Sequence, residues 1–186
     1  MPATEADGEF ATAYIGLGAN LDGPQRQVER AIAELAVLPD SRLVAVSTLY
    51  RTAPVGPRAQ PDYVNAAARL STRLDPVALL TALQGIERAH GRVRDGTRWG
   101  PRTLDLDLLL YDDLRCDLPG LNLPHPELHR RAFVLVPLLD IAPPGLRVPG
   151  RGRLEDLARA LPQNDIVPLP AGVGSLPGAS PQAALS

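Results

Sequence analysis

The sequence predicts an α+β protein, a ferredoxin-like β-α-β-β-α-β sandwich with additional C-terminal helices. Three observations predict this class. First, strand-like segments and amphipathic segments follow one another in that order. Second, Asp, Pro and Gly mark the ends of the helical segments. Third, 186 residues with 45% hydrophobic content can bury one core. We expect a flexible N-terminal tail at residues 1–12, a single domain at residues 13–165, and a disordered Pro/Gly/Ala/Ser-rich tail at residues 166–186.

The first half of the pattern contains three predicted strands and one helix. Residues 13–17 form a short apolar strand, residues 42–50 alternate like a strand, and residues 63–73 are a further β candidate. A helix is expected to start at Asp22 and Pro24. Its apolar stripe consists of Val28, Ile32, Leu35 and Leu38.

The second half begins with another helix, for which Asp75 and Pro76 are the predicted N-cap and first residue and Gly91 the stop signal. The side chains expected on its buried face are Leu79, Leu80, Leu83 and Ile86. A strand follows, and then a helical segment at residues 127–141 that contains Pro137 and is expected to start late or bend there. Residues 154–161 complete the pattern as a short helix.

The stretch RWGPRTLDLDLLLYDD sets two carboxylates into an otherwise apolar predicted strand. Because strand side chains alternate, Asp105 and Asp107 share one face with Leu109 and Tyr111, and the even-numbered leucines from Leu104 to Leu110 share the other. At roughly 7 Å apart, two anions on a half-buried face repel each other and lose hydration. Either arginines or a hard divalent cation should therefore lie between them.

Composition excludes several classes of protein. The net charge of -2 argues against a general nucleic-acid binder, and the single cysteine, Cys116, excludes a disulfide framework. The chain has no lysine, so a Walker A loop and Schiff-base chemistry lack their amine. GLGANLD has Leu21 in place of the third glycine of a dinucleotide fingerprint, and we interpret Gly16 and Gly18 as turn and close-packing residues. Without a signal peptide or a long apolar run, we expect a cytoplasmic protein.

Two further groups of residues suggest two kinds of ligand, one that carries phosphate and one that contains a flat ring. GRVRDGTRWGPR supplies arginine forks that suit phosphate oxygens, and with nearby carboxylates these are the parts that phosphoryl transfer requires. Tyr63 and Asn65 lie two apart on one predicted strand, so that a ring and an amide face the same way. Trp99 and Phe133 could add ring faces. The segment HPELH is not the zinc motif H-E-x-x-H, and Pro126 hinders a helix that would run through both His125 and His129.

These segments carry a resemblance to a known family. TAPVGPRAQPDYVNAA, GRVRDGTRWGPRTLDLDLLLYDD and LPHPELHRRAFVLVPLLDIAP closely resemble 6-hydroxymethyl-7,8-dihydropterin pyrophosphokinase of folate biosynthesis, from about Tyr14 to Pro143. The resemblance implies a ferredoxin-like fold and transfer of pyrophosphate from ATP to the pterin hydroxymethyl oxygen, giving AMP. It also implies two Mg²⁺ ions, both held by Asp105 and Asp107.

The resemblance assigns roles residue by residue. The implied catalytic residues are Arg92, Arg102, Asp105 and Asp107. The implied pterin-binding residues are Thr52, Val55, Tyr63, Asn65, Trp99 and Phe133. The implied ATP-binding residues are Gln84, Glu87, Arg92, Arg94, Arg102, Leu108, His125 and Arg131.

Two other functions remain open at this point. A metal-dependent phosphohydrolase could use the same acids and arginines with an activated water, and a non-catalytic nucleotide-binding ferredoxin-like domain could share the fold. AMP formation that depends on the pterin would separate the first from a pyrophosphokinase, and magnesium-dependent ATP binding would test the second. We expect a monomer that binds ATP and the pterin and neither nucleic acid nor membrane.

Overall fold

A computed structural model describes residues 9–54, 60–91 and 103–170. The elements in chain order are β1 (Ala11–Ala19), α1 (Pro24–Ala36), β2 (Ser41–Val46), β3 (Tyr50–Thr52), β4 (Tyr63–Thr72), α2 (Pro76–Ala89), β5 (Asp105–Tyr111), β6 (Cys116–Leu118), β7 (Leu121–Leu123), the 3₁₀ turn η1 (Leu128–Arg130), α3 (Ala132–Ile141), β8 (Arg147–Val148), β9 (Gly152–Arg153), α4 (Leu154–Arg159) and β10 (Ile166–Pro168). No helix in these ranges is long and apolar enough to cross a membrane.

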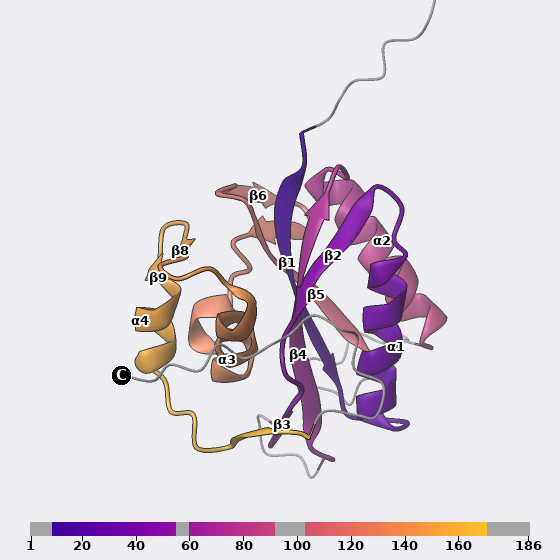
Figure 1. The fold of residues 1–186 in the computed structure, drawn as a ribbon, viewed down its shortest axis with the longest axis vertical. Helices are drawn as coiled ribbons and strands as arrows, with labels where there is room; N and C mark the ends of the chain where they lie inside the picture. The colour runs from indigo at the N-terminus through magenta and orange to yellow at the C-terminus, as the bar shows by residue number, and fades with distance from the viewer. Residues whose placement is uncertain (1–8, 55–59, 92–102, 171–186) are drawn as a thin grey trace, which may run out of the picture.

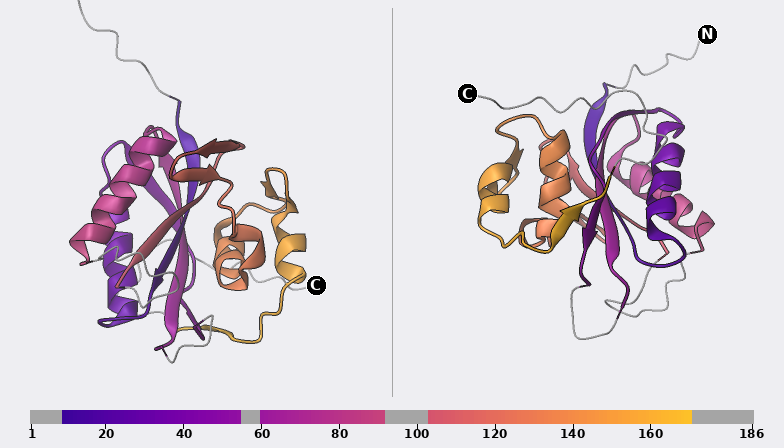
Figure 2. Two further views of the ribbon diagram at one scale, coloured as in Figure 1. Left: turned by 180° about the vertical axis from the view of Figure 1, so that it is seen from behind. Right: turned by 60° about the horizontal axis from the view of Figure 1, so that its bottom comes forward.

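The protein has three layers, with the sheet in the middle. Helices α1 and α2 cover one face, and α3 and α4 lie on the other (Figures 1 and 2). The main sheet runs in the order β10-β3-β4-β1-β5, with β2 also paired to β4, and every pairing is antiparallel. The predicted α+β sandwich with additional C-terminal helices is therefore confirmed.

Two hydrophobic clusters fill the spaces between these layers. The first packs alternate residues of β1, including Ile15, against the apolar stripes of α1 and α2. The second lies under α3 and α4 and contains Tyr14, Leu109 and Leu110. Because β1 is buried on both faces, successive residues of this strand feed different cores.

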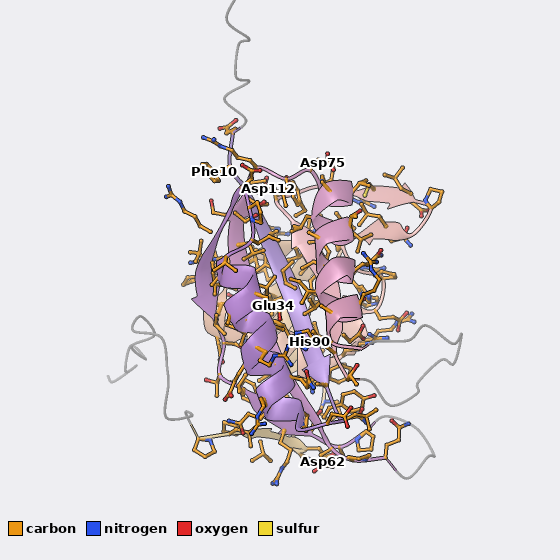
Figure 3. All side chains as sticks on the ribbon, turned by 90° about the vertical axis from the view of Figure 1, so that its right-hand side faces the viewer. Phe10, Glu34, Asp62, Asp75, His90 and Asp112 are labelled. Carbon is orange, nitrogen blue, oxygen red and sulfur yellow. The ribbon has the colours of Figure 1, made fainter. Side chains whose placement is uncertain are left out.

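The ends of α1 and α2 show which cap predictions are correct. Asp75 caps α2 as predicted, since its Oδ1 accepts the backbone N–H groups of Val77 at 2.9 Å and Ala78 at 2.8 Å. Figure 3 shows Asp75 at one end of α2 and His90 at the other. Asp22 does not cap α1, because the N-cap position belongs to Gly23, in the left-handed region at φ 74°, with no side-chain cap. Pro24 still opens α1, as expected for its fixed φ.

The predicted strand at residues 42–50 is divided in the structure. The chain leaves β2 after Val46 and resumes as β3 at Tyr50, while Ser47 fills the break by accepting the Ala67 N–H on its Oγ at 2.8 Å. The helical segment predicted at residues 127–141 also divides, into η1 and α3, and α3 runs through Pro137. Its late start at Ala132 agrees with the prediction.

The predicted domain limits are too narrow at both ends. Strand β1 begins at Ala11, before residue 13, and β10 lies after residue 165, where it pairs with β3. The remaining parts of the two predicted tails, residues 1–8 and 171–186, are outside the described residues.

Candidate active site

The register of three adjacent strands forms a row of functional side chains. Gly18 in β1 pairs with Asn65 in β4 on one side and with Asp105 in β5 on the other, and Gly16 pairs likewise with Ala67 and Asp107. Directly paired residues in antiparallel strands point to the same face. The two carboxylates and the Asn65 amide therefore share the face of the sheet that α3 covers, with glycines between them.

A cavity of about 390 Å³ lies over this row. It is lined by predicted residues from each implied group: Thr52, Tyr63, Asn65, Asp105, Asp107, Arg131 and Phe133. Gly16 and Gly18 form part of its floor, where an added Cβ would meet the Leu109 side chain at Gly16 and Asn65 Oδ1 at Gly18. This cavity joins the acidic strand to the aromatic and amide groups in one site.

Asn65 is held in place inside the cavity wall. Its side chain donates from Nδ2 to Thr52 Oγ1 at 2.7 Å, and both residues are buried, 6% and 5% exposed. Thr52 is its only hydrogen-bond partner among the described residues. The amide oxygen and the second amide hydrogen can therefore bind the polar edge of a ligand.

His125 lies beside the acid pair, in the segment between β7 and η1. Its Nε2 lies 3.9 Å from Asp107 Oδ2, and the Glu127 backbone N–H donates to its Nδ1 at 3.2 Å. In the neutral ring, that bond places the proton on Nε2, the nitrogen that faces Asp107. Burial lowers the pKa of His125 below its ordinary value, and the positive charge of Arg131 acts in the same direction. The ring is therefore a neutral hydrogen-bond donor beside the carboxylates at physiological pH.

Arg131 and Phe133 approach the cavity from the start of α3. The Arg131 guanidinium carbon lies 5.9 Å from the centroid of the Phe133 ring, within the range of a cation–π contact. A cation and an aromatic face thus lie together at the wall opposite the sheet, on the same cavity as Asp105 and Asp107.

The donor set of the acidic strand suits a magnesium ion shared with a phosphate ligand. Two carboxylates two residues apart supply hard oxygen ligands, and Mg²⁺ is commonly held by one or two carboxylates while phosphates and water complete its shell. In the ranges that the structure covers, no group of three or more His, Cys, Asp or Glu side chains could enclose an ion. The residues fit a substrate-bridged Mg²⁺ rather than a metal enclosed by protein.

Three predicted ATP-binding residues lie away from this cavity. Leu108 is 4% exposed in the hydrophobic cluster under α1 and α2, on the opposite face of the sheet from the acids. Gln84 and Glu87 belong to α2, and Glu87 is 2% exposed. Five other predicted residues lie outside the described residues: Val55, Arg92, Arg94, Trp99 and Arg102.

Sequence reasoning missed the role of Gly16 and Gly18. Neither lies in a turn, because both are in the interior of β1, where their missing side chains leave the cavity open. Their spacing of two, on a strand whose other residues are apolar except for Thr12, was the available signal.

An α+β sandwich with paired carboxylates, a cation and an aromatic, amide-bearing wall around one cavity defines a class of enzyme that transfers phosphoryl groups to a small flat acceptor. Residues 14–143 match the family model described as 7,8-dihydro-6-hydroxymethylpterin-pyrophosphokinase, and the chain belongs to this family.

Relatives with curated descriptions agree with this assignment. A protein of Pseudomonas aeruginosa is 51% identical over 157 residues, covering 84% of this chain and 96% of the relative. One of Haemophilus influenzae is 49% identical over 131 residues, covering 70% and 81%. Both are described as 2-amino-4-hydroxy-6-hydroxymethyldihydropteridine pyrophosphokinase.

Solved structures support the fold. A wild-type Plasmodium falciparum HPPK-DHPS with pterin and p-hydroxybenzoate superposes with a TM-score of 0.64 at 14% identity, over 83% of this chain and 43% of that one. This chain therefore spans less than half of that longer protein, and at such low identity the likeness concerns the fold alone.

Proposed function

We propose that the chain transfers the pyrophosphoryl group of ATP to 6-hydroxymethyl-7,8-dihydropterin in folate biosynthesis, giving the pterin diphosphate and AMP. In this reaction the pterin hydroxymethyl oxygen attacks the β-phosphorus of ATP, the bond from that phosphorus to the oxygen bridging it to the α-phosphorus breaks, and the hydroxyl proton is lost. One observation carries the proposal. A single cavity contains both the carboxylates that suit a polyphosphate-bound cation and the amide and rings that suit a heterocycle.

The acid pair is proposed as the metal-binding side of the site. Asp105 and Asp107 would hold two Mg²⁺ ions, which would neutralise the phosphate oxygens and polarise the transferred group. His125, as a neutral donor 3.9 Å from Asp107, and Arg131 are proposed to contact the nucleotide on the same side. The chain's own contribution is to fix these groups before the substrates arrive.

The pterin is proposed to lie over the glycine floor. Asn65, already oriented by Thr52, would bond the polar edge of the ring, and Tyr63 and Phe133 would cover its two faces. This arrangement brings the hydroxymethyl group toward Asp105, because Asn65, Gly18 and Asp105 form one cross-strand row.

The decisive assay measures AMP release from ATP with and without the pterin, in excess Mg²⁺ and again after chelation with EDTA. We expect AMP only when both the pterin and Mg²⁺ are present. AMP or ADP formed at the same rate without pterin would show a phosphohydrolase, and magnesium-dependent ATP binding with no turnover would show a binding domain. We also propose a cytoplasmic monomer, which light scattering and cell fractionation can test.

A further inference from the structure

At Leu106, the outer edge of β5 is bonded by a side chain instead of a strand. Among the described residues, β5 is the last strand of the main sheet, and β1 is its only strand neighbour in that sheet. The backbone N–H of Leu106 donates to Glu87 Oε1 at 2.9 Å, so the carboxylate takes the place that a backbone carbonyl of a further strand would have. An edge N–H left unpaired away from water would be costly.

The position of this bond matters because Leu106 lies between Asp105 and Asp107. Its side chain is 3% exposed in the core under α1 and α2, while its two neighbours point to the cavity on the other face. Fixing the amide of Leu106 fixes the peptide unit that joins Asp105 to Leu106, and Leu106 is bonded in turn to Asp107, so the bond restrains the strand at the point between the two carboxylates. The Glu87 side chain is long enough to bring an acceptor oxygen from α2 to this amide, so Glu87 is well suited to this task.

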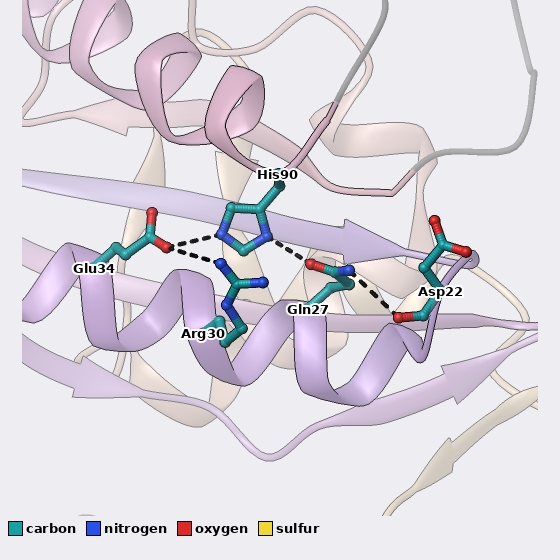
Figure 4. Close-up of polar contacts among 5 residues, drawn as sticks. All are labelled: Asp22, Gln27, Arg30, Glu34 and His90. Carbon is teal, nitrogen blue, oxygen red and sulfur yellow. Dashed lines mark hydrogen bonds and ion pairs between the residues drawn. The ribbon is translucent and has the colours of Figure 1, made fainter.

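The helix that carries Glu87 is itself anchored at this end. His90, one turn after Glu87, closes α2, and its side chain is fully buried (0% exposed). Its Nδ1 lies 2.7 Å from Gln27 Oε1 and its Nε2 3.0 Å from Glu34 Oε1, both on α1 (Figure 4). Gln27 is oriented in turn, since its Nε2 donates to the Asp22 carbonyl at 3.3 Å. The end of α2 is thus held against α1 from both sides of the ring.

From this geometry we infer that Glu87 is a positioning residue for the metal-binding acid pair and acts through the Leu106 backbone. The inference rests on the proposed function in one respect, that Asp105 and Asp107 bind the cation. It departs from the role that family resemblance implied for Glu87, because the observed bond joins this carboxylate to the acidic strand. What the site requires is that the Glu87 side chain be long enough to reach the Leu106 amide, and this length matters more than its charge.

Two variants separate reach from charge. Glu87→Gln keeps an oxygen at the same distance and removes the charge, whereas Glu87→Asp keeps the charge and withdraws the carboxylate by one methylene. The first readout is hydrogen exchange of the Leu106 amide by NMR in the ligand-free full chain. The second is Mn²⁺ affinity, followed by electron paramagnetic resonance with a non-cleavable ATP analogue.

We expect Glu87→Gln to stay near the parent in both readouts. Glu87→Asp should exchange its Leu106 amide about tenfold faster and bind Mn²⁺ about 10- to 100-fold more weakly, as when other supports of metal ligands are removed. Pterin affinity without nucleotide should stay within about twofold for both. The reverse order of the two variants, or equal behaviour, would overturn the inference. Neither readout needs turnover, so a parent that releases no AMP would refute the proposed reaction while this test still decides the role of Glu87.

Discussion

Replacing Asn65 by alanine should weaken pterin binding much more than it weakens the fold. The substitution removes a buried amide that lines the cavity, and with it the hydrogen bond that we propose between Asn65 and the polar edge of the pterin. Leaving a buried polar edge without its partner costs about 1–3 kcal/mol, which corresponds to about a 5- to 150-fold higher Kd for the pterin. ATP binding without pterin should hardly change, because the proposed nucleotide contacts come from other residues, namely the acid pair, His125 and Arg131.

The substitution should also reduce the stability of the fold, and this effect must be separated from the loss of pterin affinity. Asn65→Ala also breaks the 2.7 Å bond to Thr52, a hydroxyl that is 5% exposed, and should lower the free energy of unfolding by about 1 kcal/mol. Thr52→Val is the matched control, because it breaks the same bond and keeps the Asn65 amide in the cavity. We expect similar stability losses for the two variants but a clearly smaller loss of pterin affinity for Thr52→Val.

Isothermal titration calorimetry with pterin, with and without an ATP analogue, measures the binding difference, and urea unfolding measures stability. The reasoning fails if Asn65→Ala binds pterin as tightly as the parent. It also fails if both variants lose pterin affinity equally, since the effect would then come from the internal bond.

Three further predictions concern the acid pair, the two glycines of β1 and Tyr50. Asp105→Ala or Asp107→Ala should abolish AMP release. In metal-free buffer either variant should melt at or above the temperature of the parent, because repulsion between the two acids is relieved. Near-parent activity at saturating Mg²⁺ would contradict this prediction. Gly18→Ala should weaken pterin binding more than Gly16→Ala, because the added Cβ would lie 3.1 Å from Asn65 Oδ1 in the first case and at an ordinary contact distance of 3.4 Å from the Leu109 methyl groups in the second. Calorimetry on both variants can compare them. Burial and Asp140 raise the pKa of Tyr50 from 10.0 to about 12. The stability that this group contributes is therefore complete below pH 10 and is lost as the pH rises through 12. Tyr50→Phe should flatten the dependence of the unfolding free energy on pH in this range, and an unchanged slope would count against the prediction.

Local patterns predicted most of the fold because each depends on neighbouring residues. The stripe of α1, the cap of α2 and the alternation of β5 follow from periodicities of 3.6 and 2 that any single segment displays. The shared face of Asp105 and Asp107 is of this kind, and the structure places both on one cavity.

The alternation predicted for β5 is correct up to Leu109, which lines the cavity with Asp105 and Asp107, and wrong for Leu110 and Tyr111. Tyr14 pairs with Leu110 while the next residue, Ile15, pairs with Leu108, so Leu109 is an extra residue in the strand. Such a bulge reverses the faces that follow it. Leu110 therefore packs with the cluster under α3, and Tyr111 turns to the α2 side, where its hydroxyl donates to the Leu74 carbonyl at 2.8 Å. A bulge depends on the partner strand, which a single segment does not reveal.

The arrangement of the site also depends on pairings between distant segments. Asn65 and Asp105 face one another across Gly18 only because β1 lies between β4 and β5 in a particular register. The role of Glu87 was hidden for the same reason, since it is defined by an amide on a strand that comes later in the chain. A sequence shows which residue types are present, but their cross-strand neighbours come from the assembled sheet.

The pairing of β10 with β3 affects how the protein is completed during synthesis. Thr52, which lines the cavity, lies on β3, and the outer edge of β3 stays open until Ile166 arrives to pair with it. An open edge is a template for other chains, so a nascent or truncated molecule that ends before β10 would present such a template on the strand that carries Thr52. Once β10 is in place, Pro168 has no N–H to offer a further strand at that position, and the new edge resists extension. The last strand of the described chain thus closes the sheet and protects it from aggregation in a single step.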